Sequence, residues 1–410
     1  MTALPNQTQT PNQTQPQGKR AQEDLDIPRD AILVALTDSR GTLTGLSASY
    51  GDIARHDPQA LIGRPLAELR HDDTPPELAG LVEERLALGC PSAMPVKLRA
   101  ADGRGFWVIE VTTPMPQGGR MLLQFRPFGQ YLAPVQAIYK AARARPEAKP
   151  DAARSQLRQD LMGLGFAGFG DFCTALLSDD LRARAADLNA GLSGQVRTME
   201  ELAKMAATMR DAAHDLGEGF RNIRNEPVNM RILSNRLESG GASISMISQN
   251  YEMMAQEMGG NIDRLCSKKD GWLAMIWTAA GDGRMAVMAA ELLRELPAPA
   301  LAACAPGLDP ARAVPDHIAR LEAGARDHVR NIVQACVSVP ELGRQLRRRI
   351  NGLDVVKLLC RVENCRIGSR DVGLTAIIER LESFHSETDA LLGRLSRNAS
   401  HISQKAQTLI

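Results

Sequence analysis

Leu69-Arg70-His71-Asp72-Asp73-Thr74-Pro75 lies in the middle of a short mixed α/β segment. It places a guanidinium, an imidazole and two carboxylates in four consecutive residues, directly before prolines that can begin a helix. A hairpin follows, Val96–Ala101 and then Gly105–Thr112, joined by the turn residues Asp102-Gly103. Few other parts of the sequence bring so many functional groups together, so this stretch is the first candidate for ligand binding.

Short strands and helices surround this stretch within residues 28–129. Apolar residues that alternate with polar ones, bounded by turn residues, predict half-buried strands. The predicted strands are Ile32–Leu36, Thr42–Leu46, Val96–Ala101, Gly105–Thr112 and Met121–Phe125. Pro75 and Pro76 begin a helix that continues through Leu88, with Gly89 as its C-cap. We therefore predict one small α+β domain, a five-stranded antiparallel sheet with short helices.

The order of these elements and the Arg70-His71-x-Asp73 turn resemble a PAS sensor domain of the aerotaxis-receptor type. The resemblance implies FAD as the cofactor, held by Arg70, His71 and Asp73, with Trp107 at the aromatic position of the following strand. A guanidinium and an imidazole can donate to flavin carbonyls or to phosphate, and a carboxylate can orient them. Two pocket positions differ from the family pattern, since Ser47 replaces the usual Asn and Ser92 the usual Trp.

Other interpretations of the same residues remain open. His56 or His71 could ligate haem. The pocket could be empty, with the domain serving for dimerisation. Arg70 and Asp73 could also form a surface ion pair that caps the helix beginning at Pro75.

From about residue 171 the sequence is helical. Two interleaved heptad series predict one long helix with an apolar seam, in a coiled coil or bundle. Their members are Leu181, Leu188, Gln195, Leu202, Met209, Leu216 and Ile223, and Ala185, Leu192, Met199, Ala206, Ala213 and Phe220. Pro227 and Gly240-Gly241 interrupt the pattern, which resumes from Ile244 to Leu265 and again from Leu374 to Ile402. We expect the chain to fold back on itself and to form a homodimer.

Two segments of this region resemble the hairpin tip of methyl-accepting chemotaxis receptors. The first begins at Asn229–Glu238, and the second runs from Val362 through Glu363, Arg366 and Gly368 to Glu379. They look like degenerate copies of one unit. The resemblance implies a chemotaxis histidine kinase and its coupling protein as partners. Tyr131–Arg143 is similar to the segment that leaves aerotaxis PAS domains, which implies that the signal passes through it.

Composition excludes several other classes. The chain has 410 residues, with 49 basic against 48 acidic side chains, so bulk attraction to nucleic acid is not expected. The apolar window Trp272–Ala290 contains Asp282 and Arg284, which argues against membrane insertion. Seven scattered cysteines without a redox or zinc spacing indicate reduced thiols in the cytoplasm. No GxSxG, P-loop or HExxH motif occurs, so neither catalytic nor metal-binding residues are predicted.

These observations divide the chain into six parts. Residues 1–27 are predicted to be disordered, 28–129 to form the PAS sensor domain and 130–170 a linker helix. Residues 171–296 form a helical coiled-coil region with the first tip-like segment, 297–311 a loop, and 312–410 a C-terminal helical region with the second. The predicted function is that of a soluble, non-enzymatic sensory transducer of chemotaxis or aerotaxis type, passing a redox or oxygen signal to a dimeric output region. The alternative is a scaffold that oligomerises and recruits signalling partners without sensing.

Overall fold

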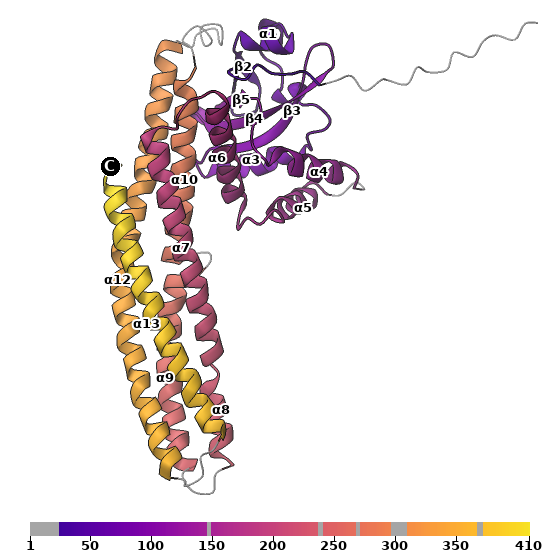
Figure 1. Cartoon of the computed structure of the whole chain (residues 1–410). Coiled ribbons are helices and arrows are strands. Elements are labelled where there is room, and N and C mark those ends of the chain that lie inside the picture. The colour runs from indigo at the N-terminus through magenta and orange to yellow at the C-terminus, as the bar shows by residue number, and fades with distance from the viewer. Residues whose placement is uncertain (1–23, 146–148, 237–240, 268–270, 297–309, 367–371) are drawn as a thin grey trace, which may run out of the picture.

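A computed structural model describes residues 24–145, 149–236, 241–267, 271–296, 310–366 and 372–410. It shows an α+β domain placed at one end of a long helical bundle (Figure 1). Residues 24–27, expected to be disordered, lie against the sheet: the Leu25 amide donates to the Gly105 carbonyl at 2.8 Å, and Ile27 is buried. The rest of the predicted disordered segment and most of the predicted loop at 297–311 fall outside the described residues.

Five antiparallel strands form the sheet of the α+β domain. They are β1 (Ile32–Thr37), β2 (Leu43–Leu46), β3 (Ser92–Arg99), β4 (Gly105–Pro114) and β5 (Arg120–Phe125). Their spatial order is β2-β1-β5-β4-β3, so the first and last strands of the chain's sheet lie side by side at its centre. This is the strand order of a PAS domain, and the predicted fold class is confirmed.

Short helices fill the connection between β2 and β3. They are α1 (Ser49–Ala54), α2 (Pro58–Leu61), the 3-10 turn η1 (Leu66–Leu69) and α3 (Glu77–Ala87). Gly89 follows α3 with a φ of +73°, a left-handed conformation that glycine adopts without strain. The predicted helix and its glycine terminator are therefore confirmed to within two residues at each end.

The connection to the bundle differs from the prediction. Where one linker helix was expected over 130–170, the structure has α4 (Leu132–Arg143) and α5 (Pro150–Met162), and α6 (Phe169–Asp187) follows. The heptad series was expected to run unbroken from Leu181 to Ile223, yet α6 ends and α7 (Gly194–Ile223) begins afresh. Asn189 adopts a positive φ in the break, and the Ser193 hydroxyl caps α7 by accepting from the Val196 amide at 3.3 Å.

The helices described for the bundle form four rods that run antiparallel to their neighbours (Figure 1). The first rod is α7 with α8 (Glu226–Ser234), and the second is α9 (Gly241–Cys266) with α10 (Trp272–Arg294). The third and fourth are α12 (Pro310–Arg366) and α13 (Val372–Gln407). Each rod packs against two others, because α7 and α12 both contact α10 and α13. The expected fold-back is confirmed, and the chain covers its own apolar seams.

The seam residues predicted in α9 and α13 lie in the core of the bundle. Ile244, Ile247, Tyr251 and Met258 are buried in α9, and Leu374, Leu381 and Ile402 in α13. In the first series Gln195 is exposed and Leu188 only half-buried, as expected for residues at a helix break. No helix among the described residues has the length and apolar character needed to cross a bilayer.

The two tip-like segments lie together, at the end of the bundle far from the sheet (Figure 1). Glu226 of α8 accepts two hydrogen bonds from Arg380 of α13, at 2.7 and 3.0 Å, although it is itself buried. The first two rods form one helical hairpin and the last two form another, and a bidentate pair of this kind fixes one hairpin against the other. Residues 237–240 and 367–371, which complete the two predicted tips, are outside the described residues.

Candidate functional site

Strand alternation gives the PAS sheet two distinct faces. Glu110 and Gln124 are paired across β4 and β5 and belong to the face that contacts α1 through Tyr50. We call it the inner face. Trp107 and Thr113 belong to the other, outer face, where Thr113 meets His317 of α12. One face therefore encloses the PAS core, while the other leads to the bundle.

The inner face carries a buried polar network centred on Glu110. One carboxylate oxygen accepts from Arg70 at 2.5 Å, and the other accepts from the Gln124 amide at 2.6 Å. The Tyr50 hydroxyl donates to the Gln124 side-chain oxygen. Glu110 is 4% exposed and Gln124 is fully buried. The hydrogen bonds from its partners therefore replace those that water would give this carboxylate, in the middle of an apolar core.

Arg70 is the one predicted cofactor residue that reaches this network. Its Nη2 binds Glu110, whereas its buried Nη1 has no hydrogen-bond partner among the described residues. A buried donor without a partner is costly, and it is a group that a ligand acceptor could satisfy. Ser47 and Ser92, the two departures from the family pattern, are both fully buried. The Ser47 hydroxyl accepts from the Val34 amide at 3.0 Å, and Ser92 contacts Cys173 of α6.

His71 and Asp73 lie instead at the rim of the sheet. The Asp73 carboxylate accepts from Lys97 at 3.0 Å and pairs with Arg143 of α4. Burial raises the pKa of Asp73, but the hydrogen bond from Lys97 and the neighbouring cations outweigh it, so the pKa lies below its ordinary value. The His71 Nδ1 accepts from the Asp73 amide at 3.1 Å, and burial together with the Lys97 charge lowers the pKa of His71.

Trp107 is on the outer face, against α4. Its ring stacks on Tyr139 with 6.4 Å between centroids, and the Lys97 ammonium lies 5.8 Å from its centroid. The Tyr139 hydroxyl donates to the Pro95 carbonyl at 3.0 Å. Lys97 thus joins Asp73 to Trp107, but the sheet separates both from Arg70. The four predicted residues do not line one pocket.

The Arg70–Asp73 ion pair that was weighed as an alternative is also not formed, since each side chain has a different partner. Glu110 and Gln124 were missed by the sequence interpretation. Their signal was a polar residue at an inward position of two otherwise apolar strands, which is visible only once the strand register is known.

The PAS domain meets the bundle through buried polar contacts. Arg85 of α3 donates to Asp282 of α10 at 2.8 Å and to the Pro91 carbonyl at 3.2 Å. The His317 Nε2 of α12 lies 2.7 Å from the Thr113 hydroxyl of β4. Thr113 in turn donates to the Met121 carbonyl at 3.2 Å. These contacts join the sensor domain to the second and third rods, and we call this region the junction.

His317 is fully buried, and its hydrogen bonds fix one protonation state. Arg320 donates to Nδ1 at 3.3 Å, so Nδ1 must be an acceptor and Nε2 carries the proton given to Thr113. Burial, together with the charge of Arg320, lowers the pKa of His317 to about 4. The imidazole is neutral at physiological pH, and its protonation would break the bond to Arg320.

A groove of about 1400 Å³ runs between the start of α6 and the helices α7, α9 and α10. Its lining includes Asp171, Arg210, His214 and Trp277, and the Arg210 guanidinium lies 4.2 Å from the Trp277 ring centroid. The groove adjoins the junction, since Arg85 and Asp282 also border it. The sensor domain and the bundle thus share one groove that faces solvent.

No protein-family model matches the chain. Over 127 residues it is 27% identical to the aerotaxis receptor of Escherichia coli strain K12, which amounts to 30% of this chain and 25% of that receptor. The chain thus matches a quarter of the receptor's length. The sequence resemblance to aerotaxis receptors is confirmed at this distant level.

Two solved sensor structures overlap weakly with the chain. The blue-light activated histidine kinase EL346 of Erythrobacter litoralis is 12% identical, with 43% of this chain and 59% of that chain covered at a TM-score of 0.23. The chromophore-binding domain of a Stigmatella aurantiaca phytochrome is 17% identical, with 35% and 50% covered at a TM-score of 0.20. Scores this low add nothing to the fold assignment, which rests on the strand order.

The buried His317 predicts a specific pH dependence. Its folded pKa of about 4 lies below the ordinary 6.5, so its stabilising contribution is complete above pH 6.5 and is lost as the pH falls toward 4. Between pH 7 and pH 5 the loss is about 2 kcal/mol. Denaturant unfolding of the full chain should show this difference between wild type and His317→Gln, which cannot titrate.

Comparison with the variant is necessary because Asp180 acts in the opposite direction. Burial raises its pKa to about 6, against the hydrogen bonds from the Gly129 and Phe128 amides, so acidification stabilises the folded state through this group. Asp180 is unchanged in both proteins and its effect cancels in the difference. Parallel pH profiles for wild type and His317→Gln would contradict the assignment.

Proposed function

We propose that this chain is a cytoplasmic sensory transducer, in which the PAS domain receives a signal and the far end of the bundle delivers it to signalling partners. The observation that carries the proposal is the junction, where Arg85–Asp282 and Thr113–His317 join the sensor to two rods of the bundle through buried contacts. The distant similarity to the aerotaxis receptor supports a sensory signalling protein. The six described cysteines are free thiols, which accords with a reducing compartment.

The sensing end is the Glu110 network. It holds a carboxylate, an amide and a guanidinium in an enclosed core, so a ligand or a proton that changes their hydrogen bonds also changes the packing of the inner face. Strand β4 carries both Glu110 and Thr113, three residues apart on opposite faces. A shift of β4 would therefore move Thr113 and change its hydrogen bond with His317 of α12. Two packings that differ by a few kcal/mol are enough for a switch of this kind.

This route replaces the one expected from the sequence. Tyr131–Arg143 was predicted to carry the signal, but α4 packs on the sheet through Tyr139 and is followed by α5, which packs on α3. The sensor contacts the bundle directly through α3 and β4, and α6 packs on both β3 and α10. We propose that the signal crosses the junction rather than following the chain.

FAD fits the described residues in part. Arg70 offers a buried, unpartnered donor, whereas Asp73 is engaged by two cations and Trp107 lies on the outer face. Flavin would supply a redox-active ring, and its electrostatics would be set by Glu110 and Arg70. Redox or oxygen sensing through FAD therefore rests on the inner-face network and not on the four residues together.

Flavin binding is tested with FAD added to the purified full chain. Binding is detected by flavin absorbance between about 350 and 500 nm. We expect the affinity for FAD to decrease at least tenfold in Arg70→Ala, which loses a charge-assisted donor. Trp107→Phe is the matched control, and it should bind like wild type. Failure of wild type to bind FAD below about 100 μM, equivalent to about −5.5 kcal/mol, would reject the flavin form of the proposal.

The output end lies where the two hairpins meet. Val355, Leu358, Leu359 and Val362 are large apolar side chains left exposed on one side of α12, at spacings of three and four residues. Such a contiguous apolar stripe favours a protein interface. We propose that a chemotaxis coupling protein or histidine kinase binds here. Homodimerisation, also expected from the sequence, is not needed to cover the seams and would use an exposed face such as this one.

The tip residues named by the resemblance behave differently from one another. Arg366 is exposed and could contact a partner, but Glu363 is only 8% exposed. Its Oε2 is buried without a hydrogen-bond partner among the described residues, so Glu363 does not present its carboxylate to a partner at the surface. Substitution of Glu363 would report on packing as well as on binding.

Partner recruitment is tested by capture of a purified chemotaxis coupling protein and kinase on the immobilised full chain. Leu358→Glu places a charge in the centre of the stripe and should reduce capture at least tenfold. Val337→Glu is the matched control, because Val337 is 68% exposed on the same helix but outside the stripe. No capture by wild type, or equal loss in both variants, would leave the chain as a scaffold without this output.

A further inference from the structure

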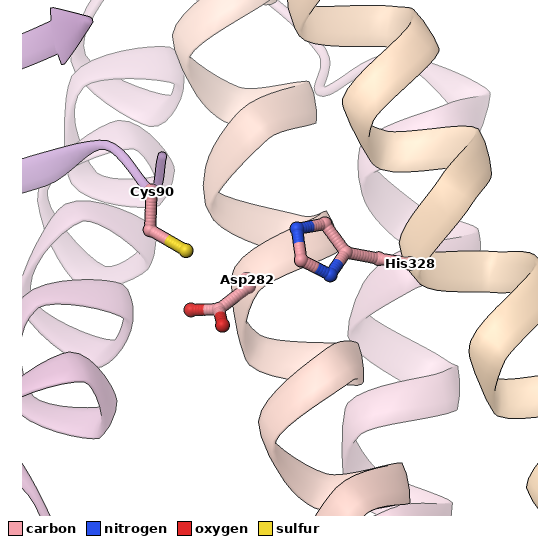
Figure 2. Close-up of side chains that lie close together, drawn as sticks. All are labelled: Cys90, Asp282 and His328. Atoms are coloured by element: carbon pink, nitrogen blue, oxygen red, sulfur yellow. The ribbon is translucent and has the colours of Figure 1, made fainter. Parts of the chain in front are cut away.

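Three side chains from distant parts of the sequence converge at the junction. Cys90 precedes β3, Asp282 lies on α10 and His328 on α12, and Figure 2 shows the thiol, the carboxylate and the imidazole pointing toward one another. One ligand atom of each lies within 4.8 Å of the others. Cys90 and Asp282 are buried, and His328 is half-buried. The sequence interpretation predicted no metal site because no two of these residues are near each other in the chain.

Local backbone features bring the three groups together. Gly89, with its positive φ, turns the chain after α3 so that Cys90 faces α10. Asp282 is flanked by Gly281 and Gly283, and a Cβ on Gly283 would lie 3.2 Å from the Cβ of His328. The glycine therefore allows α12 to approach α10 closely at the level of Asp282.

The chemistry of this set fits a borderline-soft divalent ion. Thiolate, imidazole and carboxylate are the ligands that Zn²⁺ takes in proteins, and a tetrahedral site with bonds of about 2.0–2.3 Å separates its ligand atoms by about 3.5 Å. A spread of at most 4.8 Å is thus closed by a movement of about 1 Å. Hard ions such as Mg²⁺ and Ca²⁺ prefer oxygen ligands and would not use the thiol.

Further features of the surroundings support the site. Arg85 binds the Asp282 Oδ1 at 2.8 Å, which orients the carboxylate as an outer-shell partner and leaves Oδ2 for a metal. The half-buried His328 ring offers a nitrogen as the third ligand atom. A cavity of about 170 Å³ lined by Gly89, Pro91 and His328 borders the site on the side of the imidazole.

We propose that Cys90, Asp282 and His328 bind one zinc-class divalent ion between the PAS domain and the bundle. Binding forms one bond to each side chain, the thiol gives its proton to solvent, and water occupies the fourth position. The ion would fasten the sensor domain to both hairpins at once, since α10 and α12 belong to different ones. Metal occupancy would then set the stability of the contacts between the sensor domain and the bundle.

Cobalt(II) is the probe, because its bond to a thiolate produces a charge-transfer absorption that zinc does not. Titration of the reduced full chain should give one equivalent of bound Co²⁺ with this absorption, displaced by Zn²⁺. Cys90→Ser should lose the absorption, and His328→Gln should weaken binding at least about tenfold. Cys365→Ser, at an exposed cysteine of the same chain, is the matched control and should behave as wild type.

Asp282→Asn would not isolate the metal site, since it also removes the charge that pairs with Arg85. Circular dichroism and the unfolding midpoint of each apo variant show whether it is folded, and Zn²⁺ should raise the midpoint of wild type but not of His328→Gln. Absence of stoichiometric Co²⁺ binding, or an unchanged absorption in Cys90→Ser, would overturn the proposal. Because metal binding is measured without any partner or flavin, its failure is distinct from failure of the proposed function.

Discussion

Long amphipathic helices cannot leave their apolar seams in water, and this requirement governs the arrangement of the molecule. The seam residues of α7, α9, α12 and α13 are buried against one another, so one chain supplies all four rods of the bundle. Once the rods are antiparallel, both hairpin ends fall at one extremity and the PAS domain at the other (Figure 1). The distance between sensing and output ends is therefore a consequence of core packing. Glu226–Arg380 adds a specific bond between the hairpins.

Communication over that length needs a contact that can change. Packed apolar cores resist gradual deformation, whereas buried polar pairs have a defined bonded and unbonded state. The junction contains such pairs, Arg85–Asp282 and Thr113–His317, and both connect the sensor to rods that run the length of the bundle. The Glu110 network places a second set of switchable bonds on the opposite face of the same sheet. The sheet is the element common to both.

Local patterns predicted most of the fold. Strand alternation, the Asp102-Gly103 turn and the Pro75–Gly89 helix signals gave the PAS elements, and the apolar spacing of α9 and α13 gave the bundle. The break between α6 and α7 was missed because heptad positions such as Leu188 continued through it, while the decisive feature is the Ser193 cap and the left-handed Asn189. A heptad pattern that continues through a break cannot by itself show that one helix ends and another begins.

The site was predicted less completely, for a physical reason. Of the residues that the resemblance implies for a cofactor, Arg70 reaches the Glu110 network, whereas Asp73 binds Lys97 and Trp107 stacks on Tyr139 at the outer face of the sheet. Glu110, Asp282 and His317 gain their roles from partners distant in sequence, which no local pattern encodes.

The central claim is that a change in the PAS core reaches the bundle through the junction. Hydrogen–deuterium exchange of the full chain, compared between wild type and Glu110→Gln, tests it most directly, since this isosteric change removes the charge that holds Arg70. The account predicts faster exchange in the PAS sheet and also in α10 around Asp282 and α12 around His317. Exchange altered in the PAS domain alone, with both helices unchanged, would contradict it.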